Sequence, residues 1–411
     1  MDQKSTEPSR REFIKAGLVG MAGLSQLPSA LAVESTSRGG GERQHRSVYR
    51  TLGRTGIRVP VVGMGALAAP NLVQAALDAG AAHFDTAHRY GGGLHEAMLG
   101  NALKGRTRDS FVIGTKIYGA RDNRTGLIPK NVTPSEYQAL FRQQTDESLR
   151  RLNVDYVDIL YLHGSENVEL LSMPVVKDVM QEIKRQGKAR ALGVSIHKTD
   201  LPMLRSIIDQ KIYDVVLAIY NFRQPNRDEV TRALAEATGA GLGVVAMKVM
   251  AGLYWDKERK IPINTKAALK WALQNENVQS AIPGASNLDE VAQDVSVMDD
   301  LRLTPEEEAD LRWGERNGVA GLFCDQCGRC RAECRNHLDI PTAMRSYMYA
   351  YGYRNPGQAK ETLQMLARDD IACRACPSCS VVCPLGLPVS PRLRDIARVL
   401  DVPDELLVRS A

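Results

Sequence analysis

The amino-acid sequence predicts an α/β chain, a (β/α)8 or TIM barrel followed by a helical domain that carries two cysteine motifs. Three observations predict this organisation. Short apolar runs alternate with amphipathic stretches from Tyr49 onward, as strands and helices alternate in parallel α/β folds. Eight such runs occur before residue 302. All eight cysteines lie between Cys324 and Cys383, which indicates that the thiols serve one local purpose in a separate module.

The eight apolar runs are the strand candidates, and most of them precede a stretch at helical spacing, such as Ser135–Leu152 or Met173–Gln186. Eight strand–helix units in about 250 residues match the (β/α)8 barrel. A doubly wound open sheet is the alternative, but no GxGxxG sequence follows the first run, which weakens it. The runs are Val61–Met64, His83–Asp85, Phe111–Lys116, Val157–His163, Ala189–Ser195, Asp214–Ile219, Gly243–Met247 and Gln279–Pro283.

Length and charge bound the remaining possibilities. With 411 residues the chain is longer than an ordinary small domain of about 100–150 residues, so one large fold plus an appendage is expected. We assign residues 49–302 to the barrel and 303–411 to the cysteine domain. The net charge of +5 is spread along the chain rather than gathered in a basic run, and this predicts no nucleic-acid partner.

The N-terminus has the layout of a twin-arginine (Tat) signal. Ser9-Arg10-Arg11-Glu12-Phe13-Ile14-Lys15 precedes a modestly apolar stretch that ends in Ala30-Leu31-Ala32, a small-x-small cleavage site. Residues 1–32 are therefore predicted to be a signal peptide, and 33–48 a flexible linker. Ser, Gln, Pro and Gly interrupt the apolar stretch, so no stable membrane span is expected. This predicts Tat export to the periplasm; a cytoplasmic protein with a basic terminus is the alternative.

Polar residues at the ends of three consecutive strand candidates need an explanation. Asp85, Lys116 and His163 end the second, third and fourth runs, and Tyr90 lies in the loop after the second. In a barrel of this kind, chemistry takes place where the strands end at the C-terminal face. The four side chains are therefore expected to converge.

These four residue types suit the reduction of a carbonyl group. A phenol is a poor acid at neutral pH, but an adjacent ammonium is expected to lower the pKa of Tyr90, and Lys116 can supply that ammonium. Asp85 would keep Lys116 charged and in place, while His163 could hydrogen-bond a substrate carbonyl. Hydride would arrive at the carbonyl carbon, and the proton of Tyr90 at its oxygen.

The sequence resembles the aldo/keto reductases from Tyr49 to about Leu301. The resemblance rests on a series of motifs and implies a TIM barrel in which Asp85, Tyr90, Lys116 and His163 are catalytic, with Tyr90 as the proton donor. The motifs are LGRTGIRVPVVGMG, FDTAHRYGGGLHEAMLG, the TK of VIGTK, LRRLNVDYVDILYLH, GKARALGVSIH, Tyr220-Asn221 and IPGASNLDEVAQD.

The resemblance also implies a nicotinamide cofactor, NADP or NAD, and assigns four residues to its binding: Ser195, Asn221, Gly284 and Ser286. The expected nicotinamide contacts are altered, since Ile196 follows Ser195 where the family carries Asn or Arg. Leu217 and Met247 likewise stand where many members carry Gln and an aromatic residue.

The adenosine end of the expected pocket also departs from the family. Gly284 and Ser286 fit the phosphate-binding loop, but Glu290 and Asp294 replace its usual Gln and Asn. Two carboxylates would repel a 2′-phosphate, so NADP is only the family default. An ordinary strand-to-helix turn capped by Ser286 and Asn287 is the alternative interpretation of this segment.

The cysteines form two runs with 2-2-3 spacing, and the second, which ends in Cys383-Pro384, is the full bacterial ferredoxin sequence. The first has Arg335 where proline is expected. Four cysteines per run, found twice, predict two 4Fe-4S clusters; structural zinc is the alternative. The runs are Cys324, Cys327, Cys330 and Cys334, and then Cys373, Cys376, Cys379 and Cys383.

The fourth cysteine of each run ligates the other cluster in two-cluster ferredoxins, and that pairing carried over joins Cys383 to the first run and Cys334 to the second. Residues 340–355 and 356–370 between the runs are predicted to be two helices, so the domain resembles helical ferredoxin-type domains. The order of domains resembles aldo/keto reductases with a C-terminal ferredoxin-like domain.

These expectations combine into one functional prediction: an exported oxidoreductase that interconverts a small carbonyl compound and an alcohol. Electrons would pass through the 4Fe-4S clusters to an external electron-transfer partner, and the Tat machinery would be a transient partner. The rival hypothesis is a non-catalytic electron-transfer or binding subunit with a degenerate nicotinamide pocket, as Ile196, Leu217, Glu290 and Asp294 suggest.

Overall fold

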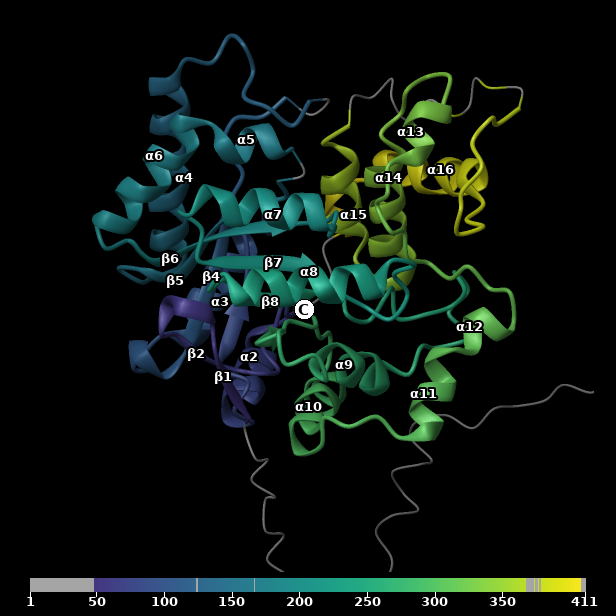
Figure 1. The fold of residues 1–411 in the computed structure, drawn as a ribbon, viewed down its shortest axis with the longest axis horizontal. Helices are drawn as coiled ribbons and strands as arrows, with labels where there is room; N and C mark the ends of the chain where they lie inside the picture. Colours follow the sequence, from purple (N-terminus) through teal and green to yellow (C-terminus); the bar gives the residue numbers. More distant parts are fainter. Residues whose placement is uncertain are drawn as a thin grey trace, which may run out of the picture. The chain divides into compact units, whose positions relative to one another are not determined.

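The structure, a computed structural model, describes residues 48–122, 125–165, 167–366, 373, 376 and 378–407 (Figure 1). The predicted signal peptide, residues 1–32, and all but the last residue of the predicted linker lie outside the described residues. Among the residues that the structure describes, no helix has both the length and the apolar character needed to cross a membrane.

Seven parallel strands form the central sheet, and each pairs with the next along the chain, from β3 to β9. All residues of β3, β4, β5, β7 and β8 are buried, as expected for parallel strands covered by helices. The strands are β3 (His83–Asp85), β4 (Val112–Ile117), β5 (Val157–Leu162), β6 (Ala189–Ile196), β7 (Val215–Ile219), β8 (Gly243–Met247) and β9 (Ser280–Ala281).

The first predicted strand, Val61–Met64, is wrong as a strand. It makes one isolated parallel bridge on each side, Val62 to Ala281 of β9 and Met64 to Phe84 of β3. The Gly63 N–H donates to Ala281 O at 2.9 Å, and the next N–H, of Met64, donates to His83 O at 2.7 Å. Because each neighbour receives a single bridge, no ladder forms, yet the segment joins the two edge strands and closes the barrel.

Helices follow the strands as the periodicity predicts. The predicted helices Ser135–Leu152 and Met173–Gln186 are confirmed as α4 (Pro134–Leu152) and α6 (Pro174–Arg185). A capping box between Thr133 and Glu136 begins α4. The other barrel helices are α2 (Pro70–Asp78), α3 (Leu94–Leu103), α5 (Val168–Ser172), α7 (Leu201–Gln210), α8 (Arg227–Gly239), α9 (Thr265–Leu273) and α10 (Leu288–Ser296).

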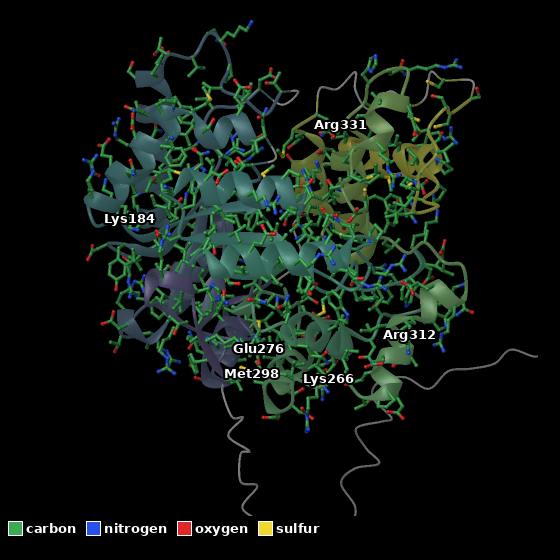
Figure 2. All side chains as sticks on the ribbon, viewed as in Figure 1. Lys184, Lys266, Glu276, Met298, Arg312 and Arg331 are labelled. Atoms are coloured by element: carbon green, nitrogen blue, oxygen red, sulfur yellow. The ribbon has the colours of Figure 1, made fainter. Side chains whose placement is uncertain are left out.

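An antiparallel hairpin of β1 (Tyr49–Thr51) and β2 (Arg58–Pro60) precedes the barrel. Short helical turns lie at η1 (Gly53–Thr55), η3 (Arg108–Ser110) and η4 (Val297–Asp299). An ion pair ties an outer helix to the start of a strand: Lys184 of α6, labelled in Figure 2, contacts Asp214, the residue before β7, at 2.6 Å.

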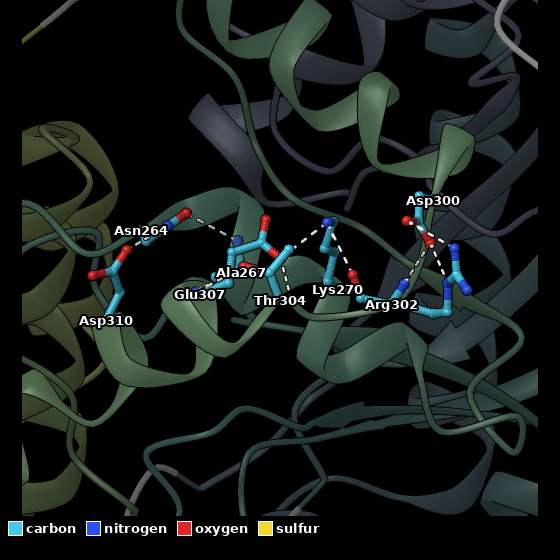
Figure 3. A network of polar contacts seen from close by, with 8 residues as sticks. All are labelled: Asn264, Ala267, Lys270, Asp300, Arg302, Thr304, Glu307 and Asp310. Carbon is cyan, nitrogen blue, oxygen red and sulfur yellow. Dashed lines mark hydrogen bonds and ion pairs between the residues drawn. The ribbon is translucent and has the colours of Figure 1, made fainter.

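A polar network fixes the segment that leaves the barrel (Figure 3). Lys270 of α9 is 5% exposed, and its ammonium donates to Arg302 O and to Glu307 Oε2, both at 3.0 Å. Glu307 also completes a capping box with Thr304 at the start of α11 (Pro305–Leu311). The first helix after the predicted boundary at residue 302 is therefore bonded to a barrel helix.

The C-terminal domain is helical around its own apolar core, which includes Leu322, Met344, Leu363 and Ile396. The two helices predicted between the cysteine runs are confirmed as α14 (Ile340–Tyr347), extended by a π-helical turn η5 (Met348–Gly352), and α15 (Pro356–Leu363). The other helices are α12 (Trp313–Arg316), α13 (Arg329–Glu333), α16 (Val389–Ala397), η8 (Arg398–Asp401) and α17 (Asp404–Leu407).

The turn η5 packs directly on the loop after β8. A Cβ on Gly352 would lie 2.4 Å from the carbonyl oxygen of Gly252, so only glycine permits this approach of the two backbones. Met348 belongs to the barrel core, and the N–H of Gly252 donates to the hydroxyl of Tyr353 at 3.3 Å. Backbone contact therefore fixes the C-terminal domain at the C-terminal end of the barrel strands.

Replacing Gly352 by alanine tests this contact. We expect Gly352→Ala to lower the free energy of unfolding by about 1–3 kcal/mol, because the new methyl group forces the two backbones apart. The matched control is Gly357→Ala, whose Cβ would lie 3.5 Å from Leu407 O, an ordinary contact. Equal denaturant midpoints for the two variants would contradict the docking described here.

Candidate active site

Three neighbouring strands deliver the predicted catalytic residues to one end of the barrel. Asp85 is the last residue of β3, Lys116 lies one residue before the end of β4, and His163 directly follows β5. Tyr90 begins η2 (Tyr90–Gly93), a turn in which Gly91 and Gly92 have positive φ. Because these strands are parallel, their C-terminal ends meet, and the structure brings all four side chains together.

Lys116 is the centre of the group. It is 2% exposed and forms a buried ion pair with Asp85 Oδ1. The same ammonium donates to Thr86 O at 2.6 Å and lies 3.5 Å from the hydroxyl of Tyr90. Gly114 makes room for the pair, since a Cβ there would meet the ring of Tyr161 at 2.9 Å and Asp85 Oδ2 at 3.4 Å.

Tyr90 stands between two histidine rings. Its ring meets that of His163 edge to face at a centroid distance of 5.9 Å, and that of His95 at 6.1 Å. His95 is itself bonded, to Thr86 Oγ1 at 2.8 Å and to the N–H of Leu67 at 3.2 Å. These contacts hold the phenol with its hydroxyl near Lys116.

The sequence predicts a lowered pKa for Tyr90, and this prediction is wrong. Burial raises the pKa of Tyr90 well above 10, and the charges of Asp85 and Glu361 act in the same direction. Glu361 belongs to α15 of the C-terminal domain, so the barrel sequence alone could not reveal its effect. Tyr90 therefore holds its proton at neutral pH, as a proton donor must.

His163 is neutral at neutral pH. Burial lowers its pKa well below 6.5, and the nearby cations Lys116 and Arg121 lower it further. The side chain of Arg121 donates to the carbonyl oxygen of His163 at 2.7 Å and fixes the backbone there. A neutral imidazole can hydrogen-bond a substrate oxygen without carrying charge into the site.

A small cavity of about 70 Å³ lies against these residues. Barrel side chains form one side of it, including Tyr90, His163 and His197, and C-terminal residues form the other, including Arg345 and Tyr349. We call this the substrate cavity. Neither domain encloses it alone.

A second cavity of about 240 Å³, here called the cofactor cavity, lies beside the first. The loop 65–68, the end of β8 and the segment 282–286 form its barrel side. Tyr90, Tyr349 and Gln358 line both cavities. A third cavity of about 790 Å³ shares Tyr90 and Gln358 with the other two.

Two of the four residues predicted to bind the cofactor, Gly284 and Ser286, line the cofactor cavity. The carboxylate of Glu290 accepts hydrogen bonds there from the N–H of Ser286 at 2.7 Å and from its hydroxyl at 2.9 Å. Burial raises the pKa of Asp294 well above its ordinary value, with Glu290 adding to the shift. The donors of this turn are thus already paired with a negative group.

The other two predicted cofactor residues bond to the backbone instead. Ser195 is 1% exposed, and its hydroxyl accepts from the N–H of Gly164 at 2.7 Å. The amide of Asn221 donates to Lys248 O at 3.2 Å, and its oxygen accepts from Arg223 N at 3.0 Å. Among the described residues that line the cofactor cavity, neither Ser195 nor Asn221 occurs.

Sequence reasoning missed Lys248, Arg345, Tyr349 and Gln358, which the structure places on these cavities. One signal was available: tyrosines occupy every second position from Tyr347 to Tyr353. In the structure Tyr347 stacks on Tyr351 at 4.4 Å, while Tyr349 and Tyr353 line the cofactor cavity.

No disulfide joins any of the eight cysteines, all of which are among the described residues. Burial raises the pKa of Cys324 to about 12, and the neighbouring Cys330, Cys383 and Cys327 contribute to the shift. Burial likewise raises the pKa of Cys330 to about 11, and Cys327 and Cys383 contribute to the shift. Cys383 of the second run thus acts electrostatically on two thiols of the first run. Among the residues that the structure describes, no group of three or more His, Cys, Asp or Glu side chains is arranged to hold a metal ion.

Residues of the second cysteine run also contact residues around Cys334, at the end of the first run. Asn336, two residues after Cys334, donates to the sulfur of Cys376 at 3.3 Å. The hydroxyl of Ser380 donates to Glu333 O at 2.7 Å, and the N–H of Val382 to the Glu333 carboxylate at 2.8 Å. The end of the first run and the second run are thus bonded to each other, and thiolate sulfur is the ligand that iron–sulfur clusters require.

Comparisons with known proteins find similarity for both parts of the chain. Residues 65–267 match the aldo/keto reductase family, and residues 323–388 match the 4Fe-4S dicluster domain. The second match decides between the two interpretations of the cysteine runs, iron–sulfur and zinc, in favour of iron–sulfur.

Two curated relatives are dehydrogenases. L-galactose dehydrogenase of Arabidopsis thaliana is 28% identical over 300 residues, which cover 61% of this chain and 88% of the relative. D-threo-aldose 1-dehydrogenase of a Pseudomonas species is 29% identical over 236 residues, covering 50% of this chain and 70% of the relative.

Solved structures share the barrel. The holo form of aldo-keto reductase AKR11C1 from Bacillus halodurans superposes with a TM-score of 0.52 at 22% identity, over 65% of this chain and 95% of that one. An aldo-keto reductase from Klebsiella pneumoniae, solved in complex with NADPH, gives 0.50 at 25% identity, over 64% and 94% of the two chains.

Proposed function

Starting from an aldo/keto reductase-like oxidoreductase that carries a 4Fe-4S dicluster domain, we propose that this protein interconverts a small carbonyl compound and its alcohol. The observation that carries the proposal is the contact of Tyr90 with Lys116 at the substrate cavity. A phenol that holds its proton next to a buried ammonium is suited to protonate a carbonyl oxygen as it becomes negative.

Each of the four residues has a step. His163 hydrogen-bonds the carbonyl oxygen and orients it, and Tyr90 gives that oxygen its proton. The ammonium of Lys116 stabilises the phenolate left on Tyr90, and Asp85 holds Lys116 in place. A nicotinamide in the cofactor cavity would supply the hydride. In the direction of oxidation the same residues act in reverse.

Gly284 and Ser286 would hold the nicotinamide nucleotide, with Ser195 and Asn221 supporting the loops around it. The complex of the Klebsiella relative with NADPH supports a nucleotide here. Glu290 already occupies the donors of Ser286 and would repel a 2′-phosphate, so NAD is proposed as the better ligand and NADP as the weaker one.

Two 4Fe-4S clusters are proposed to exchange electrons with this site. One takes Cys324, Cys327, Cys330 and Cys383, and the other Cys334, Cys373, Cys376 and Cys379. Arg345 supports the link, since it lines the substrate cavity and donates to Gln326, between Cys324 and Cys327, at 3.3 Å. An external redox protein would receive or supply the electrons one at a time.

Replacing Tyr90 tests the reaction. We expect Tyr90→Phe to lower kcat by about 100-fold or more for NADH- or NADPH-dependent reduction of 4-nitrobenzaldehyde, or for oxidation of L-galactose, because the proton donor is lost. Nucleotide absorbance and the visible cluster band are followed together under anaerobic conditions. Nucleotide oxidation that tracks cluster bleaching supports a single redox chain.

The control is Tyr156→Phe, a barrel tyrosine whose hydroxyl bonds to Asp109 at 3.1 Å. Full activity in Tyr90→Phe would refute the assigned chemistry. If neither NADH nor NADPH binds while dithionite still bleaches the clusters, the result would favour a non-catalytic electron-transfer protein over an enzyme.

Double cysteine variants test how the cysteines are shared. If Cys383 belongs with the first run, Cys330→Ser/Cys383→Ser loses one cluster, and bound iron falls from about eight to about four atoms per chain. The matched variant Cys330→Ser/Cys334→Ser then loses both clusters. Iron analysis and electron paramagnetic resonance of the reduced protein measure the outcome. Loss of both clusters in Cys330→Ser/Cys383→Ser and of one in Cys330→Ser/Cys334→Ser would instead assign each run to its own cluster.

We further propose export by the twin-arginine route to the periplasm. The layout of residues 9–32 supports it. The proposed iron–sulfur clusters support it as well, because this route would carry the protein with its clusters already assembled. Replacing Arg10 and Arg11 by lysine should retain a tagged chain in the cytoplasm, as fractionation and immunoblotting would measure. Unchanged location in that variant would mean that the signal is not used and would favour the cytoplasmic alternative.

A further inference from the structure

A second phenol–ammonium pair stands in the same site. The ammonium of Lys248 lies 2.6 Å from the hydroxyl of Tyr349 and 4.6 Å from the centre of its ring. Lys248 directly follows β8, whereas Tyr349 belongs to η5 of the C-terminal domain. The pair therefore joins the two domains at the cavities.

The backbone holds both partners in place. Lys248 has φ +55°, a left-handed conformation that is unfavourable for a residue with a side chain, and Asn221 fixes its carbonyl oxygen from the neighbouring strand end. On the other side, the π-helical turn is pressed onto Gly252 through Gly352. Single π-helical turns inside helices are frequent at functional sites.

Tyr349 is one of the residues that the substrate cavity and the cofactor cavity share. Both Tyr349 and Tyr90 line the substrate cavity and the cofactor cavity. A substrate in the first cavity and a nicotinamide in the second would both contact these shared residues. The two phenols also interact electrostatically, since Tyr349 contributes to the raised pKa of Tyr90.

The charges around the two phenols act in opposite directions. Burial by itself raises the pKa of Tyr349, but Lys248, Arg345 and Lys116 together lower the pKa below 10. Tyr353 is the other tyrosine that interacts with Tyr349. Burial lowers the pKa of Lys248, although Tyr349 partly offsets the shift. The pKa values of Tyr90 and Tyr349 are thus shifted in opposite directions within one site. Such a pair of titratable groups is typical of acid–base chemistry.

We propose that Tyr349, held by Lys248, is a second proton-transfer residue of the reaction, contributed by the C-terminal domain, and that it returns a proton to Tyr90 after each reduction. This inference rests on the proposed function. It makes the cluster domain part of the active site as well as an electron-transfer module.

The steps balance. A reduced nicotinamide nucleotide, when bound, would supply the hydride of the new C–H bond. The Tyr90 proton forms the O–H bond of the alcohol, leaving Tyr90 as phenolate. Tyr349 gives its proton to that phenolate, Lys248 gives one of its protons to Tyr349, and water reprotonates Lys248. Oxidation of the alcohol runs the same transfers backwards.

Steady-state kinetics on the full-length holoprotein test the relay, with 4-nitrobenzaldehyde as the probe. We expect Tyr349→Phe to lower kcat by about 10–100-fold with little change in KM, and Lys248→Met to do the same. The control is Tyr351→Phe, on the same turn, whose ring stacks on Tyr347. Iron content and the visible spectrum should match the wild type in all three variants.

The pH profile separates a relay from a packing role. As pH rises through the lowered pKa of Tyr349, the phenol loses the proton that it must give, so reduction by the wild type should decline there. In Tyr349→Phe that decline should be absent, and activity should fall only at higher pH, where Tyr90 ionises. Wild-type kcat and an unshifted profile in Tyr349→Phe would overturn the proposal.

The result separates the two proposals. If Tyr90→Phe is inactive while Tyr349→Phe behaves as wild type, the relay fails and the proposed function stands. If the wild type does not reduce the probe, ultraviolet absorbance of tyrosinate decides the matter. One tyrosine should ionise below the others in the wild type and be missing in Tyr349→Phe. An identical titration curve in both proteins would overturn the proposal.

Discussion

The close packing of η5 on the loop after β8 is the contact on which the rest of this structure depends. Gly352 permits two backbones to meet, and that approach carries Tyr349 to Lys248 and encloses the cavities beside Tyr90. Barrel strands supply the charged groups, but they do not close the site. Closure removes the groups from water, which strengthens every electrostatic interaction inside it.

Closure also explains the electrostatics. Lys116 lies 3.5 Å from the Tyr90 hydroxyl, yet burial and the carboxylates Asp85 and Glu361 raise the pKa of that phenol. The cations Lys248 and Arg345 have the opposite effect on Tyr349. One site thus contains a phenol that keeps its proton and another that gives it up more readily. Arg345, on α14 of the cysteine domain, further connects the site to the first cysteine run through Gln326.

Much of the barrel and of the candidate site was predictable because the signals are local. Apolar runs ending in Asp85, Lys116 and His163 place three polar groups at one edge of a parallel sheet, and the structure brings them together. The run 61–64 is apolar like the others, but it makes only one bridge to each neighbouring strand. Periodicity cannot distinguish a run that forms a strand ladder from one that makes single bridges, because the pairing depends on the strands that lie on either side.

The sequence by itself determined the order of strands and helices, the charged groups at the strand ends and the 2-2-3 cysteine runs, since each follows from the spacing of neighbouring residues. Tertiary structure alone decided the direction of the Tyr90 pKa shift and the contact between Lys248 and Tyr349. The last two groups are 101 residues apart in the chain. Burial and long-range charge depend on which distant segments meet, and no local pattern records that.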